Sequence, residues 1–239
     1  MEYALSISNL KKRLGAKEVL NGVSFDVRPS EVFGLIGPNG AGKTTTLRVI
    51  STLLQIDSGT VKVLGLELPK QAGDVRRQIS YLPEDAGAYR TLRGKEYLKF
   101  VAHLFTSEQG AEQMVKKGTA IAALGERIND KVDTYSKGMM RRLLVARALM
   151  TGPKLAILDE PSSGLDVLNA REIRSIISQA ARDGMSILLS SHNMLEVELM
   201  CDRIALINDG HIVAAGSPEE LKTRYKAANI EDVFTQVMQ

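Results

Sequence analysis

The stretch that decides the fold is EVFGLIGPNGAGKTTTLRVI, residues 31–50. It opens with the mostly apolar run EVFGLIG, which is typical of a strand buried on both faces of a parallel sheet. The glycine-rich segment GPNGAGKTT, residues 37–45, follows and matches the pattern G-x-x-x-x-G-K-[ST]. TTTLRVISTLL then has the spacing of a helix. A strand, this turn and a helix in succession predict a phosphate-binding loop.

The residue types of this loop explain its chemistry. Its glycines allow a tight backbone curl in which successive N–H groups point at β- and γ-phosphate oxygens. Lys43 adds a positive charge, and the start of the following helix favours an anion. The Thr44 hydroxyl is a candidate Mg²⁺ ligand, and Thr45 is expected near the α-phosphate. We expect all nine residues to contact the nucleotide: Gly37, Pro38, Asn39, Gly40, Ala41, Gly42, Lys43, Thr44 and Thr45.

Two adjacent acids follow another apolar run, in LAILDEP at residues 155–161. Asp159 is predicted to hold Mg²⁺, directly or through water. Glu160 would point to the opposite side of an extended chain. That geometry would give one acid to the metal and the other to a water that attacks the γ-phosphate. Acid pairs also simply end strands, but beside a phosphate loop the catalytic interpretation is favoured.

The order of the remaining patterns indicates the fold class. Strand patterns fill the first 65 residues and return in KLAILDE, MSILLSS, RIALIND and HIVAAG, whereas residues 91–149 are mainly helical in pattern. We predict an α/β fold with a phosphate-loop core, a mixed sheet and an inserted α-helical subdomain. The expected parts are a core at 1–85 plus 151–220, a helical subdomain at 86–150 and a short helical tail at 221–239.

Composition narrows the class of protein. Of the 239 residues, 44% are hydrophobic and 25% charged, which is typical of a globular chain. No apolar run approaches the roughly 18 residues of a membrane span, and the N-terminus has no signal-peptide pattern. Cys201 is the only cysteine, so we expect no intrachain disulfide and a cytosolic setting. The segment 86–150 is basic, which fits a phosphate-facing or acidic-partner surface as well as a solvated helical face.

The combined motifs resemble the ATP-binding subunits of ATP-binding-cassette (ABC) transporters, over almost the whole chain. That family has a signature segment, usually L-S-G-G-Q, which here reads YSKGM at residues 135–139. The resemblance implies that Ser136, Gly138 and the amides of that helix start bind the γ-phosphate of ATP held by a second subunit. Lys137 replaces a glycine, and its side chain would add charge or tighten the fit. A serine at a helix start is also an ordinary cap, and both interpretations use the same free N–H groups.

Other family positions have counterparts here. Asp166 of SSGLD matches the aspartate of the D-loop, which crosses the dimer interface in the family. His192 of SSH matches the switch histidine that contacts the γ-phosphate, whereas His103 and His211 are expected on the surface. Glu84 stands where the family commonly has a glutamine, and it is a third candidate Mg²⁺ ligand with Thr44 and Asp159. An ordinary strand-end acid is the alternative for Glu84.

One family feature is missing. An aromatic residue upstream of the phosphate loop usually stacks on adenine, and the matching position holds Leu14. Stacking on a base contributes about 1–3 kcal/mol, of which apolar packing by Leu14 replaces only a part. We therefore predict weaker discrimination between ATP and GTP than in the family.

The resemblance implies an ATPase with ATP and Mg²⁺ as cofactors. Its expected partners are a membrane-spanning permease subunit and a second copy of itself, with no nucleic acid, at the inner face of the cell membrane. The tail NIEDVF, residues 229–234, favours an exporter of the drug, sodium or polysaccharide type, although it also fits a plain amphipathic helix. A non-transport ABC ATPase of cluster assembly, translation or DNA repair is the alternative. A GTPase switch is disfavoured because no Asn-Lys-x-Asp motif occurs.

Overall fold

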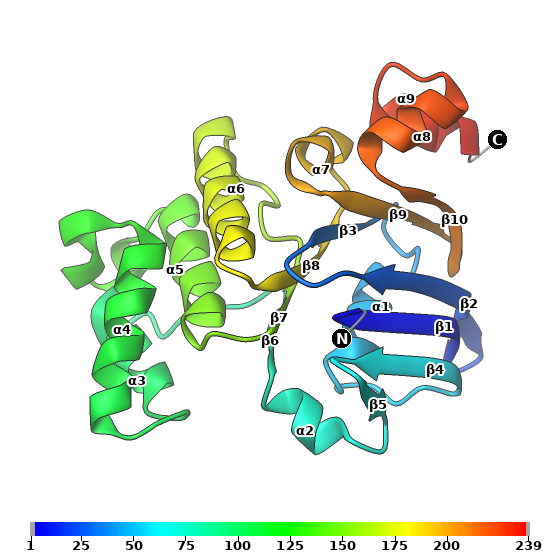
Figure 1. Cartoon of the computed structure of the whole chain (residues 1–239). Coiled ribbons are helices and arrows are strands. Elements are labelled where there is room, and N and C mark those ends of the chain that lie inside the picture. The colour runs from blue at the N-terminus through cyan, green and yellow to red at the C-terminus, as the bar shows by residue number, and fades with distance from the viewer. Residues whose placement is uncertain (1–2, 238–239) are drawn as a thin grey trace.

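The computed structural model describes residues 3–237 and contains two sheets (Figure 1). The smaller one is antiparallel, in the order β2-β1-β4-β5. Its strands are β1 (Leu5–Leu14), β2 (Lys17–Val27), β4 (Ser58–Val63) and β5 (Leu66–Leu68). Residues 1–2 and 238–239, which the predicted core and tail included, lie outside the described residues.

The larger sheet has the order β10-β9-β3-β8-β7-β6. Five of its strands are parallel and β10 is antiparallel to β9, so the sheet is mixed, as predicted. Its strands are β3 (Val32–Ile36), β6 (Ile79–Leu82), β7 (Leu155–Asp159), β8 (Ser186–Ser191), β9 (Arg203–Asn208) and β10 (His211–Gly216).

The central strands are apolar on both faces because each face covers a different core. In β3, Phe33 and Leu35 pack with the smaller sheet and with helix α1 (Lys43–Ile50), whereas Val32 and Ile36 pack with helices on the other face. All five residues of β3 are buried. This double burial explains the continuous apolar run that marked the strand in the sequence.

The other helices lie mainly on the far face and at the end of the larger sheet. The segment between β6 and β7 contains α3 (Gly94–Ala102), α4 (Glu108–Ala122), α5 (Lys137–Met150) and two short 3₁₀ turns, Gly125–Asn129 and Val132–Thr134. Figure 1 shows α3, α4 and α5 at one end of the molecule, away from the smaller sheet. After β7 come α6 (Val167–Arg182), α7 (Met194–Met200), α8 (Pro218–Tyr225) and α9 (Ile230–Val237).

The division at residues 86 and 150 into separate domains stays a prediction. Buried side chains of α3–α5 and of the larger sheet form one apolar cluster, so the helical segment is inserted in sequence but continuous in packing. Three short elements went unpredicted: β5, α2 (Ala72–Arg76) and α7. Each has three to seven residues, which is too short for a periodic pattern to emerge.

Candidate nucleotide site

The loop after β3 needs its glycines for two different reasons. Gly40 and Gly42 have φ angles of +83° and +109°, a region that side chains strongly disfavour. Gly37 has no room for a side chain, because a Cβ there would lie 2.1 Å from the carbonyl oxygen of Ile207. The loop therefore curls tightly and ends where α1 begins, at Lys43.

The Lys43 ammonium group lies inside this curl. It donates to the carbonyl oxygens of Gly37, at 2.7 Å, and Pro38, at 3.3 Å, and it lies 3.6 Å from Glu160 Oε1. A cavity of about 110 Å³ opens beside it. The cavity is lined by Val19, Pro38, Asn39, Gly40, Gly42, Lys43, Thr44, Thr45, Glu84 and Glu160. The structure thus brings most of the predicted phosphate loop together with two of the predicted acids.

Asp159 is almost fully buried behind the loop. Its Oδ1 accepts from Ser190 Oγ at 2.5 Å and from Thr44 Oγ1 at 3.4 Å, and its Oδ2 accepts from Tyr81 at 3.4 Å. Burial and the Asp159 charge raise the pKa of Tyr81 to about 12, so the phenol remains a donor at neutral pH. An oxygen cluster of one carboxylate and three hydroxyls suits Mg²⁺, which prefers oxygen ligands.

Glu160 does not point away from Asp159 as an extended chain would require, because both acids contact the start of α1, Glu160 through Lys43 and Asp159 through Thr44. Strand β7 ends at Asp159, and Glu160 adopts a left-handed φ of +49°, which redirects its side chain. Its Oε2 lies 2.9 Å from His192 Nδ1, while its backbone N–H donates to Ser190 Oγ at 3.0 Å. His192 is half exposed and Glu160 is buried, so the histidine lies on the solvent side of the acid, although it is not among the residues that line the cavity.

Glu84 is held through its backbone. Arg141 of α5 donates from Nη2 to the Glu84 carbonyl oxygen at 3.0 Å, and its Nη1 is buried with no hydrogen-bond partner among residues 3–237. Burial lowers the pKa of Arg141, although Glu84, Glu160 and Asp159 oppose that shift. The side chain of Glu84 lines the cavity, as expected of a site residue.

The signature residue Ser136 and the D-loop residue Asp166 lie apart from this cavity. Ser136 caps α5 by accepting from the Met139 N–H at 3.2 Å, and Asp166 caps α6 by accepting from the Asn169 N–H at 2.9 Å. A Cβ on Gly138 would lie 2.1 Å from Asn169 Oδ1, so the two helix starts are in close contact. The backbone N–H and the side-chain amide of Asn169 both donate to Asp166 and lower the pKa of its carboxyl group. Both caps are exposed, and neither lines the phosphate cavity of its own chain.

Leu14 also lies outside the cavity lining. It ends β1 with 44% of its side chain exposed, and Val19 contributes the apolar contact with the cavity instead. Sequence reasoning missed Val19, Ser190, Tyr81 and Arg141. Only Ser190 gave a signal, since it precedes His192 at the end of a predicted strand and so had to lie near the other strand ends.

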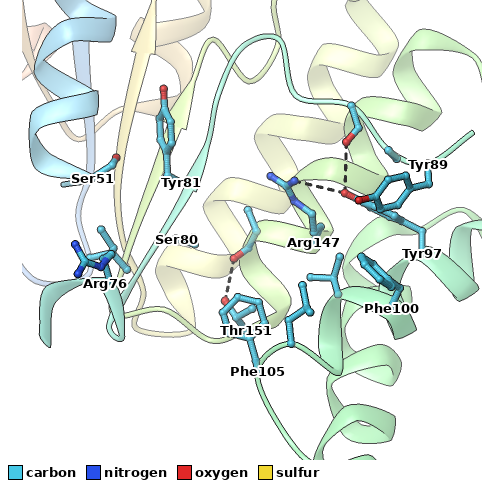
Figure 2. A pocket seen from close by; sticks show the side chains of 16 residues that line it. Ser51, Arg76, Ser80, Tyr81, Tyr89, Tyr97, Phe100, Phe105, Arg147 and Thr151 are labelled. Carbon is cyan, nitrogen blue, oxygen red and sulfur yellow. Dashed lines mark hydrogen bonds between the residues drawn. The ribbon is translucent and has the colours of Figure 1, made fainter. Parts of the chain in front are cut away.

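A second, larger hollow lies between β6 and helices α3 and α5 (Figure 2). It has a volume of about 680 Å³ and is rich in aromatic side chains. Tyr89 and Phe100 pack edge to face at 5.3 Å and are 58% and 44% exposed. Arg147 donates to the Tyr97 hydroxyl at 3.4 Å. Tyr81 lines this hollow too, although its hydroxyl contacts Asp159, so one side chain joins the hollow to the site.

The glycine-rich curl with its lysine, the buried carboxylate behind it and the acid–histidine pair define a phosphate-loop nucleoside triphosphatase. The sequence model of the ABC transporter family matches residues 20–163. The chain therefore belongs to the ABC transporter family, as an ATP-binding subunit with the fold of an ATPase.

Relatives and solved structures agree with this assignment. A linearmycin resistance ATP-binding protein of Bacillus subtilis is 38% identical over 221 residues, covering 92% of this chain and 71% of that protein. A fluoroquinolone export ATP-binding protein of Mycobacterium tuberculosis is 40% identical over 207 residues, covering 87% of this chain and 68% of that protein. The solved ATP-binding subunit of an ABC transporter has a TM-score of 0.86 at 28% identity and covers 99% of this chain and 100% of that one.

Proposed function

We propose that this ATPase drives a separate membrane-spanning subunit that exports a small molecule, and that it works as a pair of identical copies closed on two ATP molecules. One observation carries the proposal: the phosphate cavity and the exposed caps Ser136 and Asp166 lie apart on one chain. A phosphate group that binds both the cavity residues and these caps therefore needs the cavity of one chain and the caps of another. Export is favoured because the relatives named above are resistance and export proteins.

Each residue of the cavity can be given a role in ATP hydrolysis. The loop amides and Lys43 hold the β- and γ-phosphates. Glu160 accepts a proton from a water whose oxygen attacks the γ-phosphorus, and the bond from that phosphorus to the bridging oxygen breaks, releasing ADP and phosphate. His192 orients Glu160 through the 2.9 Å contact, and we expect it to reach the γ-phosphate once ATP is bound.

The oxygens of Thr44 and Asp159, with Glu84 across the cavity, would hold Mg²⁺. When bound, this ion neutralises phosphate charge. Its fit is supported by the 3.4 Å spacing of Thr44 Oγ1 and Asp159 Oδ1, two hard oxygen donors already directed at each other. Tyr81 and Ser190 keep Asp159 oriented from behind.

The hollow of Figure 2 is our candidate surface for the membrane subunit. Four exposed apolar side chains line this one hollow, Tyr89, Phe100, Leu104 and Phe105, and apolar side chains gathered in one place favour contact with another protein. Arg76 and Arg147 in its lining favour an occupant that carries acidic side chains. We therefore expect a short amphipathic segment with an acidic residue, supplied by the permease on the inner face of the membrane. Along residues 3–237 no helix is long and apolar enough to cross a bilayer itself.

Purification of this chain from membranes of its own organism, with identification of any membrane protein that accompanies it, tests the proposal. We expect co-purification that is lost in the double variant Phe100→Ser, Leu104→Ser, while the ATPase rate of the isolated subunit stays within about twofold of wild type. ATPase activity per molecule should fall on dilution, because the pair dissociates. Constant activity far below the concentration at which any dimer is detected would refute the pairing.

A further inference from the structure

Glu196 of α7 contacts two other segments of the chain through its carboxylate. Ser162 Oγ donates to Glu196 Oε2, and Arg174 Nη1 of α6 lies 3.6 Å from Glu196 Oε1. The Glu196 side chain is only 13% exposed. A carboxylate that is largely removed from water and bound by a hydroxyl and a guanidinium makes strong, charge-assisted contacts. Glu196 therefore fixes the position of α7 relative to both segments.

Through the backbone at the start of α7, Glu196 is connected to His192. The Glu196 N–H donates to Asn193 Oδ1 at 3.2 Å, so Asn193 caps α7. Asn193 directly follows His192, whose Nδ1 lies 2.9 Å from Glu160. A shift of α7 would move this cap and with it the imidazole.

Through its side chain, Glu196 is connected to the segment Ser162–Asp166. Ser162 is buried and lies two residues after Glu160, and Asp166 caps α6, the helix that carries Arg174. The carboxylate of Glu196 thus contacts the start of the segment directly and contacts, through Arg174, the helix at its end. Val167 and Leu168, which follow Asp166, are 79% and 75% exposed and extend the surface on this side of the molecule.

Glu198, on the same helix, holds α7 against a different part of the chain and so provides a comparison for Glu196. Glu198 accepts from Lys222 Nζ at 2.7 Å and from the Ile230 N–H at 3.2 Å, and so ties α7 to α8 and α9. Its pKa is lowered by these contacts. The side chains of Glu196 and Glu198 are similarly buried but contact different parts of the chain. Glu196 contacts Ser162 and Arg174, whereas Glu198 contacts the C-terminal helices.

We propose that Glu196 is a positioning residue that couples the segment Ser162–Asp166 to His192, and that it thereby carries communication between the two nucleotide sites. The inference rests on the proposed pairing of two copies. The family resemblance implies that in such a pair the segment Ser162–Asp166 lies at the interface with the other chain, whereas His192 contacts the nucleotide of its own chain. Occupation of the second site then moves Ser162, and Glu196 transmits the movement to the histidine.

The test compares four variants of the full chain: Glu196→Ala, Ser162→Ala, Glu196→Gln and the matched control Glu198→Ala. Phosphate release is measured against ATP concentration, dimerisation by light scattering and folding by thermal unfolding. Two coupled sites give a Hill coefficient of up to about 2. We expect Glu196→Ala and Ser162→Ala to lower it to about 1 and to reduce kcat about tenfold, with the apparent ATP affinity within about threefold of wild type.

Glu196→Gln keeps an oxygen that accepts from Ser162 but loses the charge opposite Arg174, so we expect it to retain most of the cooperativity. Glu198→Ala should lower the unfolding temperature without changing the Hill coefficient. Normal cooperativity in both Glu196→Ala and Ser162→Ala, with wild-type dimerisation intact, overturns the coupling role alone. The same loss of cooperativity in Glu198→Ala also overturns it. A wild-type chain that never dimerises on ATP removes the pairing, and the coupling with it.

Discussion

Replacing Glu160 by glutamine separates ATP binding from hydrolysis. The substitution keeps the size of the side chain and an oxygen near His192 Nδ1, but it removes the proton acceptor. A positioned general base contributes roughly 10²- to 10⁴-fold to a rate, so we expect kcat to fall by at least about 100-fold, or about 2.7 kcal/mol.

Binding should respond in the opposite direction. Glu160 lines the same cavity of about 110 Å³ that we assign to phosphate, so its charge lies within a few ångströms of any phosphate held there. Two like charges at 4 Å repel by about 4 kcal/mol at an effective dielectric constant of 20, and Lys43 at 3.6 Å offsets part of this. We therefore expect Glu160→Gln to bind ATP at least as tightly as wild type and to accumulate as an ATP-bound dimer.

The assay is phosphate release at saturating ATP and Mg²⁺, with dimer mass measured by light scattering. Glu31→Gln is a matched control, because Glu31 is buried to the same degree as Glu160 and pairs with Arg203, at 3.4 Å, away from the cavity. The control should lose stability and keep its kcat. Turnover by Glu160→Gln within about threefold of wild type would refute the assignment of Glu160 as the base.

Three further predictions concern other parts of the chain. Gly42→Ala places a Cβ 2.7 Å from Leu20 Cδ2 at a φ of +109°, so the free energy of unfolding should fall by about 1–3 kcal/mol, and an unchanged urea midpoint would contradict this. Burial raises the pKa of Cys201, so the folded protein should resist alkylation at pH 8 and react only when unfolded; rapid labelling of native protein would show the thiol to be accessible. Competition binding should show less than about tenfold preference for ATP over GTP, with Leu14→Tyr increasing ATP affinity about fivefold or more through stacking, and strong adenine selectivity in the wild type would refute the inference from Leu14.

The segments with a local pattern were predictable. The phosphate loop is specified by its own glycines, whose backbone angles and lack of Cβ the curl requires, and so the strand, the loop and α1 follow from consecutive residues. The caps Ser136 and Asp166 are equally local, because each accepts from an N–H three residues ahead.

Contacts across strands were not predictable in the same way. Ser190 reaches Asp159 because the two residues are register partners in β8 and β7, a pairing that depends on the strand order. The direction of Glu160 depended on one left-handed residue just past a strand end, which no alternation pattern encodes.

The sequence by itself predicted the phosphate loop, because consecutive residues specify its backbone, and it predicted the accompanying acids and histidine through their positions in the motifs of the family. Only the tertiary structure decided that Glu160 faces His192, that Arg141 holds Glu84, and that Glu196 joins Ser162 to α7. Those pairs are separated by 32 to 57 residues, and their meeting depends on how strands and helices pack rather than on any local preference of the chain.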